Sequence, residues 1–237
     1  MATLYSPKIV TNGLVMYLDA GNNRSYPGSG TSWTDLSRNG ITGTLTNGPT
    51  FNSANGGSIV FDGTDDYTAC GNLSTLNDMS ISMWVKVLSN AGSYKAFAGA
   101  VGASNNDFDT GFNIDMQNGA RSAFDRCSIE GGFLRIGGGT NFMTTSVPFG
   151  DWANICFTIS ATYIQFYLNG SAQFGTTRLN NASSTIGMSS LVIGARPFYL
   201  IDRCVNANIA STAIYNRALS AAEIRQNYHA TKGRFGL

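Results

Sequence analysis

The stretch from Ile59 to Lys86 constrains the fold of this chain more than any other. Its opening apolar run stops at Asp62-Gly63, a pair typical of turns because Gly accepts a positive φ and Asp can bond its own backbone. The segment from Met79 to Val87 then alternates with a period of two, and one of its faces carries four apolar side chains: Met79, Ile81, Met83 and Val85. That period predicts a half-buried antiparallel strand. The stretch therefore indicates a protein built from β-sheets.

Further strands are predicted on both sides of this stretch. The apolar run from Leu14 to Leu18 indicates a buried strand, and two alternating segments that end at Leu168 are followed by Asn169-Gly170. An Asn-Gly pair favours a type I′ turn, because both central residues of that turn need a positive φ. The segment from Ile209 to Tyr215 predicts the last strand, which we expect to lie near the N-terminal one.

One helix is predicted near the end of the chain. Ser220 and Glu223 form the capping-box pattern, and Leu219 and Ile224 fit the hydrophobic staple that often accompanies it. We therefore expect a short helix from about Ala221 to Thr231, packed against the sheets.

The length of 237 residues suits a single all-β domain that spans residues 1–237. Within it we expect an N-terminal extension of residues 1–12 and, after the helix, a tail of residues 232–237. Phe235 and Leu237 are apolar, and a free terminus has little reason to expose them. They should dock either on their own domain or on a neighbouring subunit.

The charge composition excludes two classes of partner. Charged residues make up 12% of the chain and the formal net charge is +1, which provides no basic surface for nucleic acid or for an anionic membrane. The first residues lack the basic region and apolar core of a secretory signal. No apolar stretch is long enough to cross a bilayer. We expect a protein made in a cytoplasm, with neither nucleic acid nor membrane as a partner.

Several segments together resemble a known family. They are GSIVFDGTDDY (57–67), MSISMWVK (79–86), DWANICFTISATYIQFYLNG (151–170), LVIGAR (191–196) and IASTAIYNRALSAAEI (209–224). In this order they resemble a laminin-G-like, concanavalin A-like jelly-roll domain. The resemblance implies an all-β fold: a two-sheet antiparallel jelly-roll sandwich with one short C-terminal helix. It says less about function, because this fold hosts lectins, glycosidases and structural modules.

The two ends of the chain add a biological context. GLVMYLDAGNNRSYPGSGTSWTDLSRNG (13–40) and AIYNRALSAAEIRQNYHATKGRFGL (213–237) resemble laminin-G-like modules common in virion proteins of tailed bacteriophages. The resemblance implies a virion structural protein, foremost a capsid decoration protein that could adhere to glycans. It would be made in the host cytoplasm and would form homo-oligomers in the particle beside capsid or tail subunits. The alternatives are a tail- or fibre-associated adhesin and a soluble calcium-dependent lectin that binds cell-surface glycans.

The residues that catalysis would need are scarce. His229 is the only histidine, and no nucleophile signature lies near it. Glycosidases of this fold use a close group of carboxylates that flank the glycosidic bond. The chain has two glutamates, of which Glu223 is the predicted helix cap and Glu130 stands without alternating acidic partners. We expect a protein that is not an enzyme; a degenerate glycosidase is the weaker alternative.

Two sets of residues are candidates for ligand binding. Aromatic side chains in loop-like context could stack on sugar rings; they are Tyr94, Phe108, Phe142, Phe198 and Tyr199. The alternative is that these rings cover the edges of the sandwich. Carboxylates could hold calcium, the one cofactor that we consider; they are Asp62, Asp65, Asp66, Asp107, Asp109 and Asp115. The alternative is that they cap backbone amides in turns.

The four cysteines are far apart in the sequence and form no CxxC motif: Cys70, Cys127, Cys156 and Cys204. This spacing argues against a structural zinc site. We expect free, buried thiols, Cys156 among them, and keep disulfides within or between subunits as the alternative.

Overall fold

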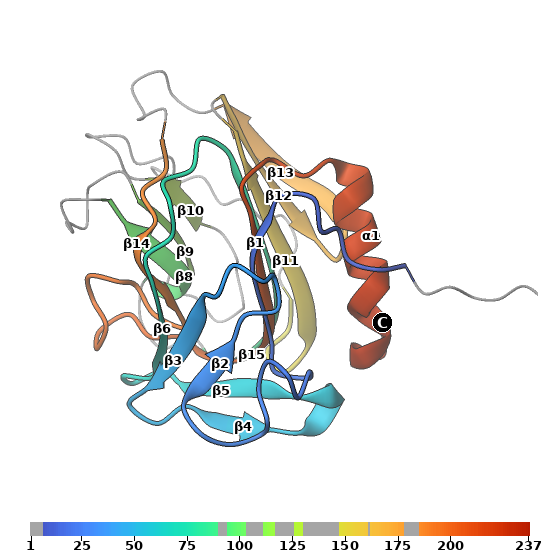
Figure 1. Cartoon of the computed structure of the whole chain (residues 1–237). Helices are drawn as coiled ribbons and strands as arrows, with labels where there is room; N and C mark the ends of the chain where they lie inside the picture. The colour runs from blue at the N-terminus through green and yellow to red at the C-terminus, as the bar shows by residue number, and fades with distance from the viewer. Residues whose placement is uncertain are drawn as a thin grey trace, which may run out of the picture.

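The structure is a computed structural model that describes residues 7–89, 94–102, 111–116, 126–129, 147–160, 162–177 and 185–237, with the backbone alone at 126–129 and 174–177. Two antiparallel sheets face each other in this part of the chain, and a C-terminal helix lies on the outer side of one of them (Figure 1). The sandwich and the helix match the expected fold class. Of the helices described, none is long and apolar enough to cross a membrane.

We call the sheet beneath the helix the back sheet. Its strands are, in spatial order, β13 (Ser171–Thr177), β12 (Tyr163–Leu168), β11 (Trp152–Ile159), β7 (Met79–Ser89), β15 (Asn206–Tyr215), β5 (Ser58–Asp62) and β4 (Thr50–Asn52). β1 (Leu14–Asp19) also joins this sheet by pairing with the second half of β15. The predicted neighbourhood of the first and last strands is thus confirmed.

The opposite sheet is the front sheet. Its strands are, in spatial order, β10 (Arg126–Ile129), β9 (Phe112–Met116), β8 (Lys95–Val101), β14 (Ser189–Ile193), β6 (Tyr67–Gly71), β3 (Thr42–Thr46) and β2 (Ser32–Thr34). A short 3₁₀ turn, η1 (Ala54–Gly56), separates β4 from β5. Between these runs of neighbouring strands the chain crosses from one sheet to the other several times, as in a jelly roll.

The main core lies between the sheets. The four apolar side chains that the alternation places on one face of β7 belong to it, each at most 1% exposed. They pack with side chains of the front sheet such as Phe97 and Phe112, which are fully buried. The predicted inner face of β7 is thus confirmed.

The outer face of β7 differs from the half-buried strand that the alternation predicts. Ser80 is fully buried and Trp84 is 2% exposed, so the strand is covered on both sides. The Ser80 hydroxyl donates to the Arg217 carbonyl at 2.9 Å and accepts from the Leu219 amide at 2.8 Å, which satisfies its polar group without water. The residues that cover this outer face, such as Arg217 and Leu219, are far away in the sequence. The alternation within β7 therefore could not predict them.

Helix α1 (Ala221–Thr231) begins with the predicted capping box. The Ser220 hydroxyl accepts the Glu223 amide, and the Glu223 carboxylate accepts the Ser220 amide at 2.9 Å. Arg217 adds two hydrogen bonds to the same carboxylate, at 2.6 and 2.9 Å. These bonds, and next the Ser220 amide, lower the pKa of Glu223 to about 2. Ile224 is 1% exposed and packs with Leu219 and Tyr215 on the back sheet.

The tail continues as a second 3₁₀ turn, η2 (Lys232–Phe235), and docks on the outer face of the back sheet. The Phe235 ring stacks on Trp84 with centroids 4.0 Å apart and lies 4.7 Å from the Trp152 ring. Arg234 donates to the Asp19 carboxylate at 2.7 Å. The predicted docking of Phe235 is therefore confirmed, and its partner is its own domain. Leu237 is 46% exposed and does not dock on its own domain, so for this side chain the alternative of a neighbouring subunit stays a prediction.

The residues described from position 7 onward in the N-terminal extension pack on α1. The Val10 amide donates to the Asn227 side chain at 2.8 Å, and the Lys8 carbonyl accepts from Gln226 at 2.7 Å. Val10 itself is 8% exposed. This segment is thus a strap that ties the helix to the back sheet.

The hairpin turn and the cysteines follow the sequence reasoning where they are described. Asn169 and Gly170 have φ values of 50° and 75°, as a type I′ turn between β12 and β13 requires. Cys70, Cys156 and Cys204 are free and buried. The Cys127 side chain lies outside the described atoms.

Candidate functional site

An acidic turn joins β5 to β6 at one rim of the sandwich. Asp62, Asp65 and Asp66 each bring one carboxylate oxygen within 4.8 Å of the others. The Asp62 amide donates to the Asp66 carboxylate at 3.0 Å, and Asp62 in turn accepts from the Thr64 amide at 2.8 Å. Burial raises the pKa of Asp66, and the neighbouring charges of Asp62 and Asp65 act in the same direction. The predicted capping of backbone amides by these carboxylates is therefore confirmed at Asp62 and Asp66, and the three carboxylates also lie close together.

The donor set of the acidic turn suits a hard divalent cation, because calcium takes carboxylate and carbonyl oxygens. Some carbonyls of the turn are already engaged. The Gly63 oxygen accepts from the Lys95 ammonium at 3.3 Å, and the Asp65 oxygen accepts from Asn47 at 2.9 Å. The three carboxylates are thus the groups that would hold an ion, and calcium binding stays a prediction.

The other predicted calcium ligands do not join this turn in the described part of the chain. Asp115 lies on β9, is 1% exposed and pairs with Arg196 at 3.6 Å. Asp107 and Asp109 lie outside the described residues.

The connection from β14 to β15, residues 194–205, crosses the outer side of the front sheet; we call it the 194–205 loop. In Figure 1 it is the orange segment on the side of the molecule opposite α1. Its backbone is fixed at both ends, because the Gly194 amide donates to Phe97 at 2.8 Å and the Ala96 amide donates to Arg203 at 3.0 Å. The loop is therefore held on β8 by main-chain bonds.

A buried ion pair anchors the start of the loop. The side chains of Arg196 and Asp115 are 5% and 1% exposed, and the pair links the loop to β9. Each charge is neutralised by the other, as burial demands. Arg196 thus positions the loop and is not available to a ligand.

The end of the loop presents a second arginine in different surroundings. The Arg203 guanidinium lies 3.9 Å from the centroid of the Tyr199 ring and 5.0 Å from that of Tyr94. We call these three residues the arginine–tyrosine cluster. Phe198 packs edge-on against Tyr199 at 5.2 Å and is 53% exposed, so an aromatic surface adjoins the cluster. Tyr94 has a φ of 63°, a left-handed conformation that costs a side chain of its size about 1–2 kcal/mol.

The acidic turn and the arginine–tyrosine cluster lie on the same rim. Lys95 joins them, because its ammonium donates to the Gly63 carbonyl at 3.3 Å and to the Asp202 carbonyl at 3.2 Å. Carboxylates, a guanidinium and aromatic rings are thus gathered from the β5–β6 turn, from the start of β8 and from the 194–205 loop.

The structure brings three of the five aromatic candidates together. Tyr94, Phe198 and Tyr199 meet at the 194–205 loop, whereas Phe108 and Phe142 lie outside the described residues. Sequence reasoning missed Arg203. Its spacing of four from Tyr199 could have suggested it, since the Arg203 amide donates to the Tyr199 carbonyl at 3.1 Å and brings both side chains to one turn.

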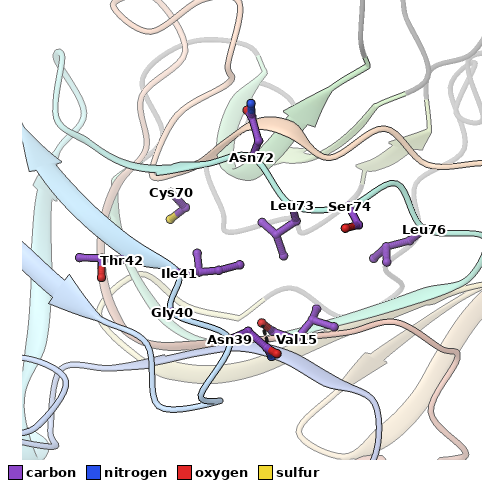
Figure 2. Close-up of a pocket in the computed structure, with 10 residues that line it drawn as sticks. All are labelled: Val15, Asn39, Gly40, Ile41, Thr42, Cys70, Asn72, Leu73, Ser74 and Leu76. Carbon is purple, nitrogen blue, oxygen red and sulfur yellow. Dashed lines mark hydrogen bonds between the residues drawn. The ribbon is translucent and has the colours of Figure 1, made fainter.

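A hollow of about 500 Å³ opens between the sheets at another edge of the sandwich (Figure 2). Val15, Ile41, Leu73 and Leu76 converge in its centre, and Asn39 turns its amide to the backbone at Val15. The ten residues that line it include no aromatic or charged side chain. Sugars bind to aromatic faces and placed polar groups, so this hollow suits a glycan less well than the rim does.

The catalytic candidates lie apart from the rim. Glu223 is committed to the helix cap, and His229 is exposed on α1. Glu130 lies outside the described residues.

Comparisons with known proteins agree with this architecture. A family model described as the concanavalin A-like lectin/glucanases superfamily matches residues 62–225. Among curated proteins, none matches the chain.

Three solved structures illustrate the shared fold. Domain 4 of an extracellular GH43 arabinanase from Geobacillus stearothermophilus, in complex with arabinotriose, is 18% identical with a TM-score of 0.68, covering 91% of this chain and 98% of that one. The ligand-binding domain of botulinum neurotoxin serotype D, in complex with N-acetylneuraminic acid, is 13% identical with a TM-score of 0.63, covering 92% of this chain and 51% of that one. The sialidase of Trypanosoma rangeli is 16% identical with a TM-score of 0.63, and the chain covers 33% of it. At these identities the likeness shows the fold alone.

Proposed function

Because the chain belongs to the concanavalin A-like lectin/glucanase superfamily, we propose that it is a carbohydrate-binding protein without catalytic activity. The observation that carries the proposal is the rim: three aromatic rings meet there beside carboxylate and guanidinium groups. Aromatic faces take the CH surface of a sugar, and such polar groups take its hydroxyls. The arabinotriose and N-acetylneuraminic acid in two proteins of this fold support a glycan as the class of ligand.

Two carboxylates in the described part of the chain, Glu223 and Asp115, are held in ways that support a role without catalysis. A glycosidase needs two carboxyl groups on either side of the scissile bond. Glu223 is bound by Arg217 and by the start of its helix, and Asp115 is buried against Arg196. Incubation with each bound oligosaccharide should therefore release no reducing sugar; steady release would contradict this part of the proposal.

The binding is tested on a glycan panel with two matched variants. Phe198→Ala removes a ring that is 53% exposed beside the cluster, and Tyr163→Ala removes one that is 44% exposed on β12 of the other sheet. Loss of a stacking contact should weaken binding about tenfold in Phe198→Ala, and Tyr163→Ala should bind as the wild type does. No binding to any glycan, or equal binding by all three proteins, would contradict the proposed site.

For the setting of this binding we propose a phage particle, on which the protein would be a capsid decoration protein. The support is the resemblance of residues 13–40 and 213–237 to laminin-G-like modules of phage virion proteins. Capsid or tail subunits would then be its partners, and several copies would be present per particle. Peptides of the chain should co-purify with intact virions through a density gradient. Their presence in the free lysate alone would favour the soluble lectin instead.

A further inference from the structure

The arginine–tyrosine cluster contains a cation whose hydrogen-bond donors are not used by the described protein. The Arg203 guanidinium lies over the rings of Tyr199 and Tyr94. In the part of the chain that the structure describes, no side-chain hydrogen bond or ion pair of Arg203 is found. Its side chain is half-buried, so it still reaches solvent, while the two tyrosine rings restrain its position. Stacking fixes the plane of a guanidinium and leaves its edge donors available.

Arg196, the other arginine of the same loop, differs from Arg203 in its burial and in its ion pair. Its side chain is 5% exposed and its charge is matched by a carboxylate that is 1% exposed. Arg203 has no such carboxylate among the described residues, although the acidic turn lies on the same rim. The fold thus anchors one arginine of the loop and presents the other.

The surrounding charges limit what an anion at Arg203 can be. The Lys95 ammonium already donates hydrogen bonds to two carbonyls, those of Gly63 and Asp202. The acidic turn then brings three carboxylates to the same rim. A polysulfated chain would meet strong repulsion from these carboxylates, whereas a ligand with a single negative charge needs only one free cation.

We propose that the cluster binds a sugar that carries a carboxylate, with Arg203 as the residue that recognises the acid group. A planar guanidinium matches a carboxylate with two parallel hydrogen bonds. The exposed Phe198 ring packs edge-on against Tyr199, next to the cluster, and in this proposal it contacts the apolar face of the same sugar. This inference rests on the proposed function and narrows its ligand to uronic or sialic acids.

The test is a calorimetric titration of the full chain with two acidic probes, 3′-sialyllactose and a glucuronic acid disaccharide. Each is compared with its own methyl ester, which keeps the shape and removes the charge, and lactose is the neutral control. The variants are Arg203→Gln and, as the control, Arg225→Gln. Arg225 is exposed on α1, on the outer side of the back sheet, whereas Arg203 lies in the loop on the front sheet. Each substitution removes one positive charge.

The wild type and Arg225→Gln should bind at least one acid about 10- to 100-fold more tightly than its ester, the usual effect of a charged hydrogen-bonded pair. In Arg203→Gln the acid and the ester should bind alike. The melting temperature of each variant is measured beside the titration to show that the variant is folded. Arg203→Lys keeps the charge without the planar fork, so its preference for the acid over the ester should lie between those of the wild type and Arg203→Gln.

The other outcomes separate this inference from the proposed function. Equal binding of acid and ester by the wild type would overturn the inference and leave a neutral glycan as the ligand. A preference for the acid that persists in a folded Arg203→Gln would also overturn it, because another cation would then recognise the acid. No binding of either acid, with neutral glycans of the panel bound, would overturn the inference alone; no binding of any glycan would remove the proposed function as well.

Discussion

The docked tail provides the sharpest stability prediction, because one aromatic ring closes the outer face of the back sheet. Phe235 is 8% exposed, stacks on Trp84 and packs at a tilt against Trp152. Replacing a buried Phe by Ala costs about 3–5 kcal/mol, and the position of Phe235 near the end of the chain favours the lower end of this range. We therefore expect Phe235→Ala to lower the free energy of unfolding by about 3 kcal/mol.

The assay is denaturant unfolding followed by tryptophan fluorescence, with a thermal melt beside it. For a domain of this size, about 3 kcal/mol corresponds to a fall in the melting temperature of roughly 6–12 °C. Leu237→Ala is the control from the same tail, since that side chain is 46% exposed and should change stability by less than about 0.5 kcal/mol. A melting temperature of Phe235→Ala within about 2 °C of the wild type, or equal losses in both variants, would refute the docking of the tail.

Four further predictions follow from other parts of the structure. Ile224→Ala should cost roughly 2–5 kcal/mol by denaturant unfolding, since the side chain is 1% exposed beneath α1; a loss under about 0.5 kcal/mol would contradict its burial. The hydrogen bonds from Arg217 lower the pKa of Glu223 to about 2 from its ordinary 4.5, so the stability from this carboxylate is complete above pH 4.5 and is lost as the pH falls toward 2. In Glu223→Gln the free energy of unfolding should depend less on pH between 4.5 and 2 than in the wild type. An equal pH dependence in both proteins would show that the Arg217–Glu223 pair does not contribute to stability. Burial raises the pKa of the Cys156 thiol to about 12, so thiol reagents at pH 8 should label it only after unfolding, as peptide mass spectrometry would report. Calcium should raise the melting temperature and Asp65→Asn should remove that rise; a melt insensitive to both calcium and a chelator would exclude the ion from the acidic turn.

The elements that local rules define could be predicted from the sequence. The capping box fixed the start of α1 at Ala221, because the two reciprocal hydrogen bonds involve residues only three apart. The hairpin at Asn169-Gly170 follows from the φ values that these residues tolerate. The inner face of β7 follows from its period of two.

The second covered face of β7 could not be predicted in this way. The alternation of β7 places Ser80 and Trp84 on the face that the sequence pattern predicts to be exposed to solvent. Ser80 is buried because Arg217 and Leu219 satisfy its hydroxyl, and Trp84 is buried because Phe235 covers it. These partners follow more than 130 positions later, as the separation of 139 positions between Ser80 and Leu219 illustrates.

The candidate site was predictable in part. Aromatic residues in loops suggested Tyr94, Phe198 and Tyr199, but the sequence did not show that they meet. Arg203, the cation between these rings, was missed. Its contact with Tyr94 joins two segments that are far apart in the sequence, and they meet only because the 194–205 loop is hydrogen-bonded to β8. Composition gave a net charge near zero and therefore no sign of a local cation.

The most direct test of the account is a crystal structure of the protein soaked with the glycan that binds best on the panel. We expect a sugar ring over Phe198 and Tyr199, with its acid group within hydrogen-bond distance of Arg203. A sugar in the hollow of Figure 2, or on the face that α1 covers, would contradict the central claim that the 194–205 loop is the binding site.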